Sequence, residues 1–284
     1  MKVAGGGRGR DTVAPTTVTA RRFDKYEGTG NDFLLLDAAL WPDAEVTPAL
    51  AKALCDRHTG VGGDGLLWVR HLPEEGAARL VILNADGSRP EMCGNGVRCV
   101  AAWLADRGGL APGGVVTILS DAGPRATTLL GRAEGQWQVE VDMGVARVAD
   151  APDAVTVRGR TLSVRAVDLG NPHGVIFDPA GDAMEVVGAV TALAAFPKGV
   201  NVEFVTREGD GFRVKVHERG VGWTMACGTG ACAVAAAALR DGIARPGTSV
   251  PVTLDGGTLS ITVAPDGRVR MTGPARRVFS GALA

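Results

Sequence analysis

The sequence predicts an α+β protein of two pseudo-symmetric lobes, each a curved, mostly antiparallel sheet wrapped around a central helix. Three observations lead to this fold: a duplicated cysteine-glycine segment, many short strands in both halves, and one strongly apolar helix in each half. The strands do not alternate regularly with helices, so an α+β arrangement is favoured over a doubly wound parallel sheet.

The duplicated segment comprises residues 92–96 (MCGNG) and 226–230 (ACGTG). Each copy places one cysteine before a Gly-x-Gly turn, and an alanine-rich helical pattern follows. Cys93 and Cys227 are 134 positions apart (227 − 93), and further glycine, valine and alanine residues recur at the same offset. We therefore predict an internal repeat that carries one thiol per half.

Composition restricts the class of partner. The chain has 284 residues, 45% of them hydrophobic, with 30 Lys and Arg against 31 Asp and Glu. Without a long run of one charge, neither nucleic acid nor an anionic membrane is expected as a partner, so a small-molecule substrate is expected. No apolar run approaches the roughly 18 residues of a membrane helix, and the N-terminus lacks an apolar signal segment. The expected location is the cytoplasm.

The cysteine and histidine content argues against two kinds of site. Five cysteines without a Cys-x-x-Cys spacing, and only four histidines, fit neither a disulfide framework nor a zinc site. Residues 60–65 (GVGGDG) match G-x-G-x-x-G but follow a predicted helix and precede a strand, the reverse of the dinucleotide-binding order. We expect no metal and no cofactor.

The predicted boundaries follow the repeat. Residues 1–20 are predicted to be a flexible N-terminal tail, residues 21–140 the first lobe with Cys93, and residues 141–272 the second lobe with Cys227. Residues 273–284 are predicted to return to the first lobe.

Apolar runs between turn residues predict the individual elements. In the first lobe a helix begins at Pro48, after the N-cap Thr47, and ends near Gly60. Its strands are predicted at 33–37, 66–69, 79–83, 115–119, 126–130 and 137–141. The second lobe has a predicted helix at 182–195 and strands at 154–158, 161–168, 174–177, 201–206, 212–217, 250–254, 258–263 and 268–272. The helices that follow Cys93 and Cys227 are apolar nearly all round, which predicts that other elements enclose them.

The position of the two cysteines suggests a reaction. Unpaired backbone N–H groups at a helix N-terminus favour a thiolate and can also bind a carboxylate. If the halves face one another across a cleft, the α-carbon of a bound substrate lies between two sulfurs. One thiolate can then remove the α-proton from one face while the opposite thiol delivers a proton to the other. For Cys55, Cys99 and Cys232 we retain the simpler interpretation of small buried hydrophobes.

Six ordered motifs support one family. They are residues 28–33 (GTGNDF), 84–88 (NADGS), 92–98 (MCGNGVR), 170–173 (GNPH), 199–202 (GVNV) and 218–222 (ERGVG), the last followed by 226–230 (ACGTG). Together they resemble the diaminopimelate epimerase family, and the resemblance runs from about Phe23 to the C-terminal strand.

The resemblance implies a pyridoxal-independent isomerase that interconverts LL- and meso-2,6-diaminopimelate, on the bacterial route to lysine and peptidoglycan precursors. It implies that Cys93 and Cys227 are the acid/base pair, and that His173 and Glu218 modulate the proton affinities of the thiols. The implied substrate-binding residues are Asn31, Asn84, Gly94, Asn95, Asn171, Asn201, Glu218, Arg219, Gly228 and Thr229. The family fold, two similar lobes around central helices, agrees with the pattern. The oligomeric state, monomer or homodimer, stays open.

Alternatives remain for individual residues. A substrate with two ammonium and two carboxylate groups needs neutral amides, one cation and one anion, which four asparagines with Glu218 and Arg219 supply. Each asparagine could instead be a turn residue that bonds its own backbone, and Glu218 with Arg219 an exposed ion pair.

Two positions depart from the family pattern. Gly65 stands where glutamine is frequent, which is expected to loosen contact with the distal end of the substrate. Trp223 stands where glutamate is usual, and is expected to change packing near the Cys227 turn.

Two other functions stay open. One is a racemase of the same fold that acts on another amino acid. The other is a thiol redox sensor in which Cys93 and Cys227 form a regulatory disulfide.

Overall fold

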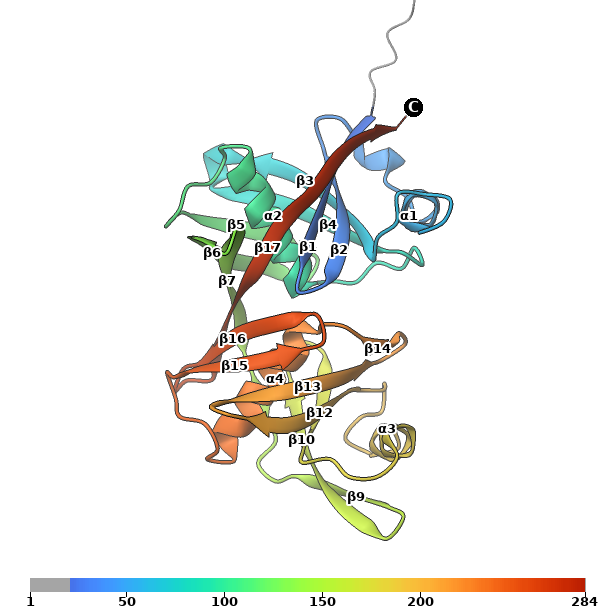
Figure 1. Ribbon diagram of the computed structural model, residues 1–284, viewed down its shortest axis with the longest axis vertical. Helices are drawn as coiled ribbons and strands as arrows, with labels where there is room; N and C mark the ends of the chain where they lie inside the picture. The colour runs from blue at the N-terminus through green and yellow to red at the C-terminus, as the bar shows by residue number, and fades with distance from the viewer. Residues whose placement is uncertain (1–20, 284) are drawn as a thin grey trace, which may run out of the picture.

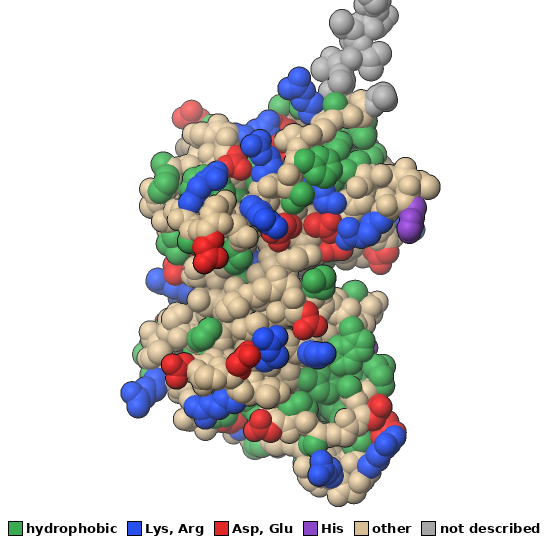
Figure 2. Space-filling view, in the orientation of Figure 1, with side chains coloured by type: hydrophobic (Ala, Val, Ile, Leu, Met, Phe, Trp, Pro, Cys, Tyr) green, Lys and Arg blue, Asp and Glu red, His purple; other side chains and the backbone are tan. Residues whose placement is uncertain are grey.

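Two lobes stacked along the long axis make up the protein (Figure 1). The computed structural model describes residues 21–283, so the tail predicted for residues 1–20 lies outside the described residues. The molecule narrows between the lobes, and on the face shown in Figure 2 Lys and Arg side chains are interspersed with Asp and Glu. No helix among the described residues is long and apolar enough to cross a membrane. The predicted α+β fold is confirmed.

In the first lobe an almost entirely buried helix, α2 (Gly94–Asp106), is surrounded by strands, with α1 (Pro48–Cys55) outside. The strands of this lobe are β1 (Arg21–Gly28), β2 (Asn31–Asp37), β3 (Gly65–Leu72), β4 (Ala77–Asn84), β5 (Val115–Ser120), β6 (Gly123–Ala133) and β7 (Gln136–Val145). The long strand β17 (Arg268–Leu283) pairs with both β1 and β7, which closes the sheet around α2.

In the second lobe the strands surround α4 (Gly228–Arg240), and α3 (Ala183–Thr191) packs outside. Its strands are β8 (Arg147–Val148), β9 (Asp153–Val157), β10 (Arg160–Asp168), β11 (Pro172–Phe177), β12 (Asn201–Glu208), β13 (Gly211–Glu218), β14 (Gly222–Thr224), β15 (Ser249–Leu254) and β16 (Gly257–Val263). β17 pairs with β16, so the same strand belongs to the sheets of both lobes.

The strand pairing shows the internal repeat. Most pairs are antiparallel, as predicted. The parallel pairs occur at equivalent places: β2 with β3 and β4 with β5 in the first lobe, β11 with β12 and β13 with β15 in the second. The central helix of each lobe lies in the connection before β5 or β15. The duplicated cysteine turns therefore occupy equivalent positions in two equivalent lobes.

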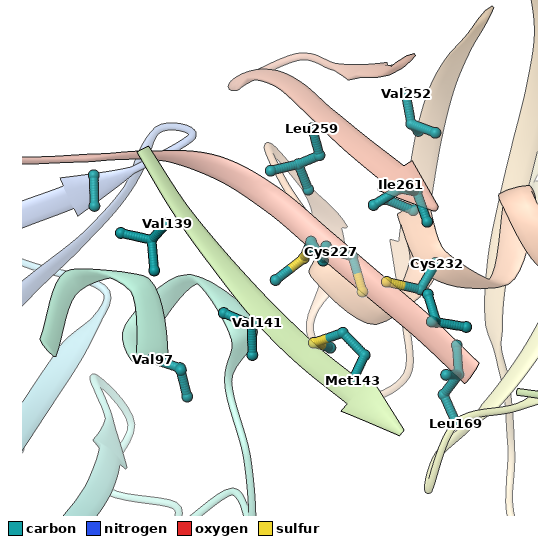
Figure 3. Packing of buried hydrophobic residues seen from close by; sticks show 14 of the residues in the cluster. Val97, Val139, Val141, Met143, Leu169, Cys227, Cys232, Val252, Leu259 and Ile261 are labelled. Atoms are coloured by element: carbon teal, nitrogen blue, oxygen red, sulfur yellow. The ribbon is translucent and has the colours of Figure 1, made fainter. Parts of the chain in front are cut away.

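One continuous hydrophobic core joins the two central helices. Figure 3 shows Val139, Val141 and Met143 along β7, between Val97 of α2 and Cys227 of α4. Small side chains in α4 let the surrounding strands approach closely. The dense packing that results removes apolar surface from water and so stabilises the core. Separate clusters lie under α1 and α3.

Several elements differ from the prediction. The helix predicted to end near Gly60 is α1, which ends at Cys55 because Asp56 leaves the helical conformation and its side chain accepts the His58 and Thr59 backbone N–H groups in a turn. The helix predicted at 182–195 is α3, which ends at Thr191 because the chain continues in i→i+3 turns that bury Phe196. The strand predicted at 268–272 continues to Leu283 because β1 pairs with it. That partner, β1, had no prediction of its own because its pairing partner lies at the other end of the chain.

Gly65→Ala is expected to lower the free energy of unfolding. A Cβ on Gly65 would lie 2.6 Å from the Leu83 carbonyl oxygen, so the β3–β4 backbone must shift, at a cost of about 1–3 kcal/mol. Urea denaturation monitored by circular dichroism measures the change. Gly188→Ala, on exposed α3 with no atom near its Cβ, is the matched control and should stabilise by up to about 1 kcal/mol. Equal stabilities for the two variants would contradict the close approach at Gly65.

Candidate active site

The two repeated cysteines occupy the same structural position. Cys93 is the N-cap residue of α2 and Cys227 the N-cap residue of α4. Each sulfur accepts a hydrogen bond from a backbone N–H in the first turn, Gly96 at 3.5 Å and Gly230 at 3.3 Å. Both thiols therefore lie at the positive end of a helix, as the duplicated sequence predicts.

The N-termini of the two helices meet at one side chain of β17. A Cβ on Gly94 would lie 2.8 Å from Met271 Cε, and a Cβ on Gly228 would lie 3.1 Å from Met271 Sδ. Asn95 reaches across with Nδ2 at 3.4 Å from the Ala226 carbonyl oxygen. A side chain at either glycine would therefore displace Met271, and Asn95 Oδ1 lies 3.6 Å from a Cβ on Gly228, so the two cysteine turns lie close together.

Burial changes the acidity of both thiols. Loss of water raises the pKa of the Cys93 thiol and raises that of Cys227 well above its ordinary value. The Glu218 carboxylate raises the pKa of both, so one carboxylate is close to both thiols. The N–H groups of Gly96 and Gly230 act in the opposite direction. The helix amides therefore offset part of the burial effect, and the thiolate preference expected from the sequence is not reached by helix position alone.

Two asparagines surround Cys93. Asn31 donates from Nδ2 to Asp64 Oδ2 at 2.6 Å, which turns its Oδ1 toward the site, 3.9 Å from Cys93 Sγ. Asn95 donates from Nδ2 to the same Asn31 oxygen at 3.2 Å, and is 2% exposed. The structure thus brings Asn31 and Asn95 together with the first thiol.

A chain of hydrogen bonds leads to Cys227. Thr229 Oγ1 lies 3.4 Å from Cys227 Sγ and accepts from Asn171 Nδ2 at 3.2 Å. Asn171 Oδ1 is 3.1 Å from His173 Nε2. His173 is fully buried, and hydrogen-bonded contacts through Asn171 and Thr229 connect it to the thiol.

A third group lies where β12 begins and β13 ends. Asn201 accepts the backbone N–H of Arg219 on Oδ1 at 2.9 Å and donates to the Pro172 carbonyl at 3.2 Å. Thr224 donates from Oγ1 to Glu218 Oε1 at 2.5 Å. The exposed Arg219 guanidinium bonds only a backbone carbonyl among the described residues and has no carboxylate partner there. The carboxylate of Glu218 and the cation of Arg219 therefore do not neutralise one another.

Asn84 differs from the other asparagines. It ends β4, and its Nδ2 donates to Ser88 Oγ at 2.9 Å within its own turn. The described residues include no hydrogen bond from Asn84 to another predicted site residue. In this structure its side chain behaves as the turn residue that the sequence left as an alternative.

Local packing accounts for both departures from the family pattern. Gly65 is a buried residue at the start of β3, where the Leu83 carbonyl oxygen leaves no room for a side chain. Trp223 is 48% exposed in β14, with its ring centroid 5.5 Å from that of Phe204 and 5.3 Å from that of His217. Trp223 therefore covers the β12–β13 surface beside the Cys227 turn.

Sequence reasoning assigned no role to two fully buried charged residues, Arg98 and Glu203. Glu203 Oε1 is 2.6 Å from His173 Nδ1, and Arg98 lies one helical turn beyond Asn95. The available signal was a charge inside an apolar run, GVRCV for Arg98 and NVEFV for Glu203.

The site can hold an anion and transfer protons. Carboxylate recognition is available from the amides of the two Gly-x-Gly turns, and proton transfer from two thiols. Among residues 21–283 no cluster of three or more His, Cys, Asp or Glu side chains is arranged to hold a metal ion. All five cysteines are free thiols.

Comparison with known proteins points to one family over most of the chain. The family model described as diaminopimelate epimerase matches residues 23–149 and 165–278. A diaminopimelate epimerase of Synechocystis sp. is 41% identical and the match covers 92% of this chain and 98% of the relative. A diaminopimelate epimerase of Gloeothece citriformis is 39% identical, and one of Leptospira biflexa is 40% identical. Each of these matches covers 91% of this chain and 97% of the relative.

Solved structures with little sequence identity share the fold. A Bacillus anthracis phenazine biosynthesis protein of the PhzF family has a TM-score of 0.71 at 14% identity, covering 94% of this chain and 100% of that one. A hydroxyproline epimerase from Agrobacterium vitis, with bound trans-4-hydroxy-L-proline, has a TM-score of 0.68 at 16% identity, covering 92% and 90%. At such identities the likeness concerns the fold alone.

Asn95→Ala is expected to destabilise the protein by about 1–3 kcal/mol, because it removes one hydrogen-bond partner from the buried Arg98 and one from Asn31. Asn84→Ala is the matched control; its loss of one bond to Ser88 at a partly exposed turn should cost less than about 1 kcal/mol. Thermal and urea unfolding of both variants measure the difference. Similar losses would show that Asn95 does not join the two helix ends.

Proposed function

The chain belongs to the diaminopimelate epimerase family, and we propose that it interconverts LL- and meso-2,6-diaminopimelate with Cys93 and Cys227 as its acid/base pair. The chain is thus an isomerase of the route to lysine and peptidoglycan precursors. The observation that carries the proposal is the convergence of two cysteine-capped helix N-termini on Met271.

Proton transfer follows from the pair of thiols. One cysteine, as thiolate, removes the α-proton from one face of the substrate and becomes a thiol. The other cysteine, as thiol, donates its proton to the opposite face and becomes a thiolate. The stereocentre is inverted, no bond other than C–H and S–H changes, and no redox step is required. The reverse reaction uses the same residues with their roles exchanged.

Stabilisation of the carbanion comes from the helix ends. The α-carboxylate is held by backbone N–H groups of the turns Gly94–Asn95 and Gly228–Thr229, where both helix dipoles favour negative charge. These dipoles are fixed before the reaction begins, so they stabilise developing charge without reorganisation. The buried position of both turns strengthens this effect.

High proton affinity of the thiols serves the reaction. The α-C–H group of an amino acid is a very weak acid. When the pKa of a thiol is raised, its thiolate becomes a stronger base than an ordinary thiolate. Burial raises the pKa of both thiols, and the carboxylate of Glu218 adds to it. Glu218 and, through Asn171 and Thr229, His173 therefore modulate the thiols.

Recognition of the rest of the substrate uses polar side chains around the two turns. The free guanidinium of Arg219 binds the distal carboxylate, and Glu218 binds an ammonium group. The amide side chains of Asn31, Asn95, Asn171 and Asn201 complete the set, whereas Asn84 bonds within its own turn. A racemase acting on another amino acid is the second candidate; Arg219 favours diaminopimelate because a distal carboxylate needs a cation.

The proposal extends to the setting of the enzyme. Two reduced thiols are required, and all five cysteines are free, which supports a cytoplasmic location. Its partner is the small-molecule substrate, with no nucleic acid and no membrane. We also propose a homodimer, supported by the exposed Val278 and Phe279 on β17; light scattering of the purified protein tests it.

Cys93→Ser and Cys227→Ser are each expected to abolish turnover, because a serine hydroxyl is too weak an acid and base for either proton transfer. Solvent-deuterium incorporation at the α-carbon of diaminopimelate, followed by NMR, measures the loss. Cys55→Ser, away from both turns, is the control for a cysteine change. Retention of turnover in either variant would refute the two-base assignment.

Arg219→Gln is expected to raise the KM for diaminopimelate about tenfold or more, because a charge-assisted hydrogen bond to the distal carboxylate is lost. Arg213→Gln is the control: Arg213 is exposed on β13, the strand that ends just before Arg219, and pairs only with Glu208 among the described residues. Initial rates with diaminopimelate and with amino acids lacking a distal carboxylate complete the test. Faster exchange in such an amino acid than in diaminopimelate would favour the racemase.

A further inference from the structure

Two fully buried residues of opposite charge lie close to the helix turns that carry the thiols. Arg98 is in α2, the helix that Cys93 caps, and Glu203 of β12 lies against the first turn of α4, the helix that Cys227 caps. Neither charge is part of the proton-transfer pair or binds the substrate in the proposed function.

Arg98 has only neutral partners among the described residues. Its Nη2 donates to Thr29 Oγ1 at 2.9 Å and to Asn95 Oδ1 at 3.0 Å, and its Nε donates to the Pro274 carbonyl at 3.2 Å. Its Nη1 lies 3.6 Å from Met271 Sδ. No carboxylate of residues 21–283 forms an ion pair with it. A buried cation without a counter-charge is costly, so a nearby anion is strongly stabilised.

Of the cysteines near Arg98, one can supply that anion. Cys99 and Cys232 are enclosed in the hydrophobic core, where burial raises the pKa of Cys232 to about 12 and that of Cys99 further, so both stay neutral. Loss of water raises the pKa of Cys93 as well, but its side chain is only partly buried, its sulfur accepts the Gly96 N–H, and Arg98 lowers its pKa. The thiolate of Cys93 is therefore the natural counter-charge of Arg98.

The carboxylate of Glu203 lies against the N-terminus of α4, the helix that Cys227 caps. A Cβ on Gly230 would lie 2.8 Å from Glu203 Oε1, so this oxygen lies against the first turn of α4. His173 holds Oε1, while Oε2 is buried and has no hydrogen-bond partner in the described part of the chain. A negative charge at this place opposes the helix dipole that would otherwise favour a thiolate at Cys227.

The first lobe serves as an internal control for this interpretation. β2 and β3 pair Phe33 with Gly65, as β11 and β12 pair His173 with Asn201. Two residues further on, Leu67 packs at 3.1 Å from a Cβ on Gly96, in the place that Glu203 occupies at Gly230. Phe33 and Leu67 therefore fill the same space with apolar side chains.

In the first lobe the apolar pair Phe33 and Leu67 fills this space, so the fold does not require ionisable side chains there. A buried pair of ionisable groups rarely stabilises more than well-packed hydrophobic residues would. The buried His173–Glu203 pair thus points to a role beyond packing.

We propose that Arg98 and Glu203 are positioning residues that make Cys93 the thiolate and Cys227 the thiol of the resting enzyme. The inference rests on the proposed function, in which one thiol must be ionised and the other protonated. In the resting state Cys93 then removes the first α-proton and Cys227 supplies the proton to the opposite face.

The other charges near the thiols do not reverse this assignment of the thiolate to Cys93 and the thiol to Cys227. Glu218 of β13 raises the pKa of both thiols, so it acts in the same direction on each. Glu203 of β12 raises the pKa of Cys227, whereas Arg98 of α2 lowers that of Cys93. His173 of β11 faces Glu203 and Asn171, and the Thr229 hydroxyl partly offsets the effect of Glu203 on Cys227.

The test measures the reactivity of each thiol in the full-length enzyme without substrate. Iodoacetamide reacts with thiolates, and tandem mass spectrometry of peptides gives a rate for each cysteine. Each rate is compared with the wild-type rate at the same site, so differences in access cancel. Glu203→Gln is expected to increase the Cys227 rate about tenfold, the change that one pKa unit makes in the thiolate fraction, and to leave Cys93 unchanged.

The second arm uses Arg98. Arg98→Met is expected to decrease the Cys93 rate about tenfold, while Arg98→Lys, which keeps the charge, retains most of it. Circular dichroism melting checks that each variant folds. If Arg98→Met does not fold, Glu203→Gln alone decides. Glu208→Gln, an exposed change on the same strand as Glu203, should alter neither cysteine.

Two results would overturn the inference: a Cys227 rate that changes less than about twofold in Glu203→Gln, or a larger change at Cys93 than at Cys227 in that variant. Failure of the proposed function gives a different result. If Cys93→Ser keeps its deuterium incorporation, the two-base reaction is wrong whatever the alkylation rates show. Loss of turnover in both serine variants with unchanged alkylation in Glu203→Gln would leave the reaction standing and refute only the role of Glu203.

Discussion

The close approach of two helix N-termini is the constraint on which the site depends. Gly94 and Gly228 both lie against Met271, so a larger side chain at either position would have to displace the Met271 side chain. β17 makes this approach possible because it belongs to both sheets and carries Met271 between the helices. This contact brings together the N-terminal amides of both helices, both thiols and the bridging Asn95.

Two opposing effects meet at the thiols. The helix ends favour negative charge on sulfur, whereas burial and Glu218 disfavour it. The result is a pair of groups that bind protons tightly and still have backbone N–H groups to stabilise the charged form. Such a balance suits a reaction that must remove a weakly acidic proton and then return one.

The repeat explains why the two lobes are similar, and the departures from it explain how they differ in function. Phe33 and Leu67 of the first lobe correspond to His173 and Glu203 of the second. Arg98 has no charged equivalent 134 positions later, where Cys232 is found. A symmetric scaffold thus places two equivalent sulfurs, and unsymmetric buried charges give them different proton affinities.

The sequence by itself determined the repeat, the two buried helices, most strands and the cysteine turns, because these depend on local patterns of apolar residues and glycine. It could not determine β1, the full length of β17, or what surrounds Glu203. Strand pairing between the two ends of the chain and the surroundings of a buried charge depend on contacts between distant residues. Tertiary structure alone decided that Gly94 and Gly228 meet at Met271, because close packing of separate elements leaves no local signal in the sequence.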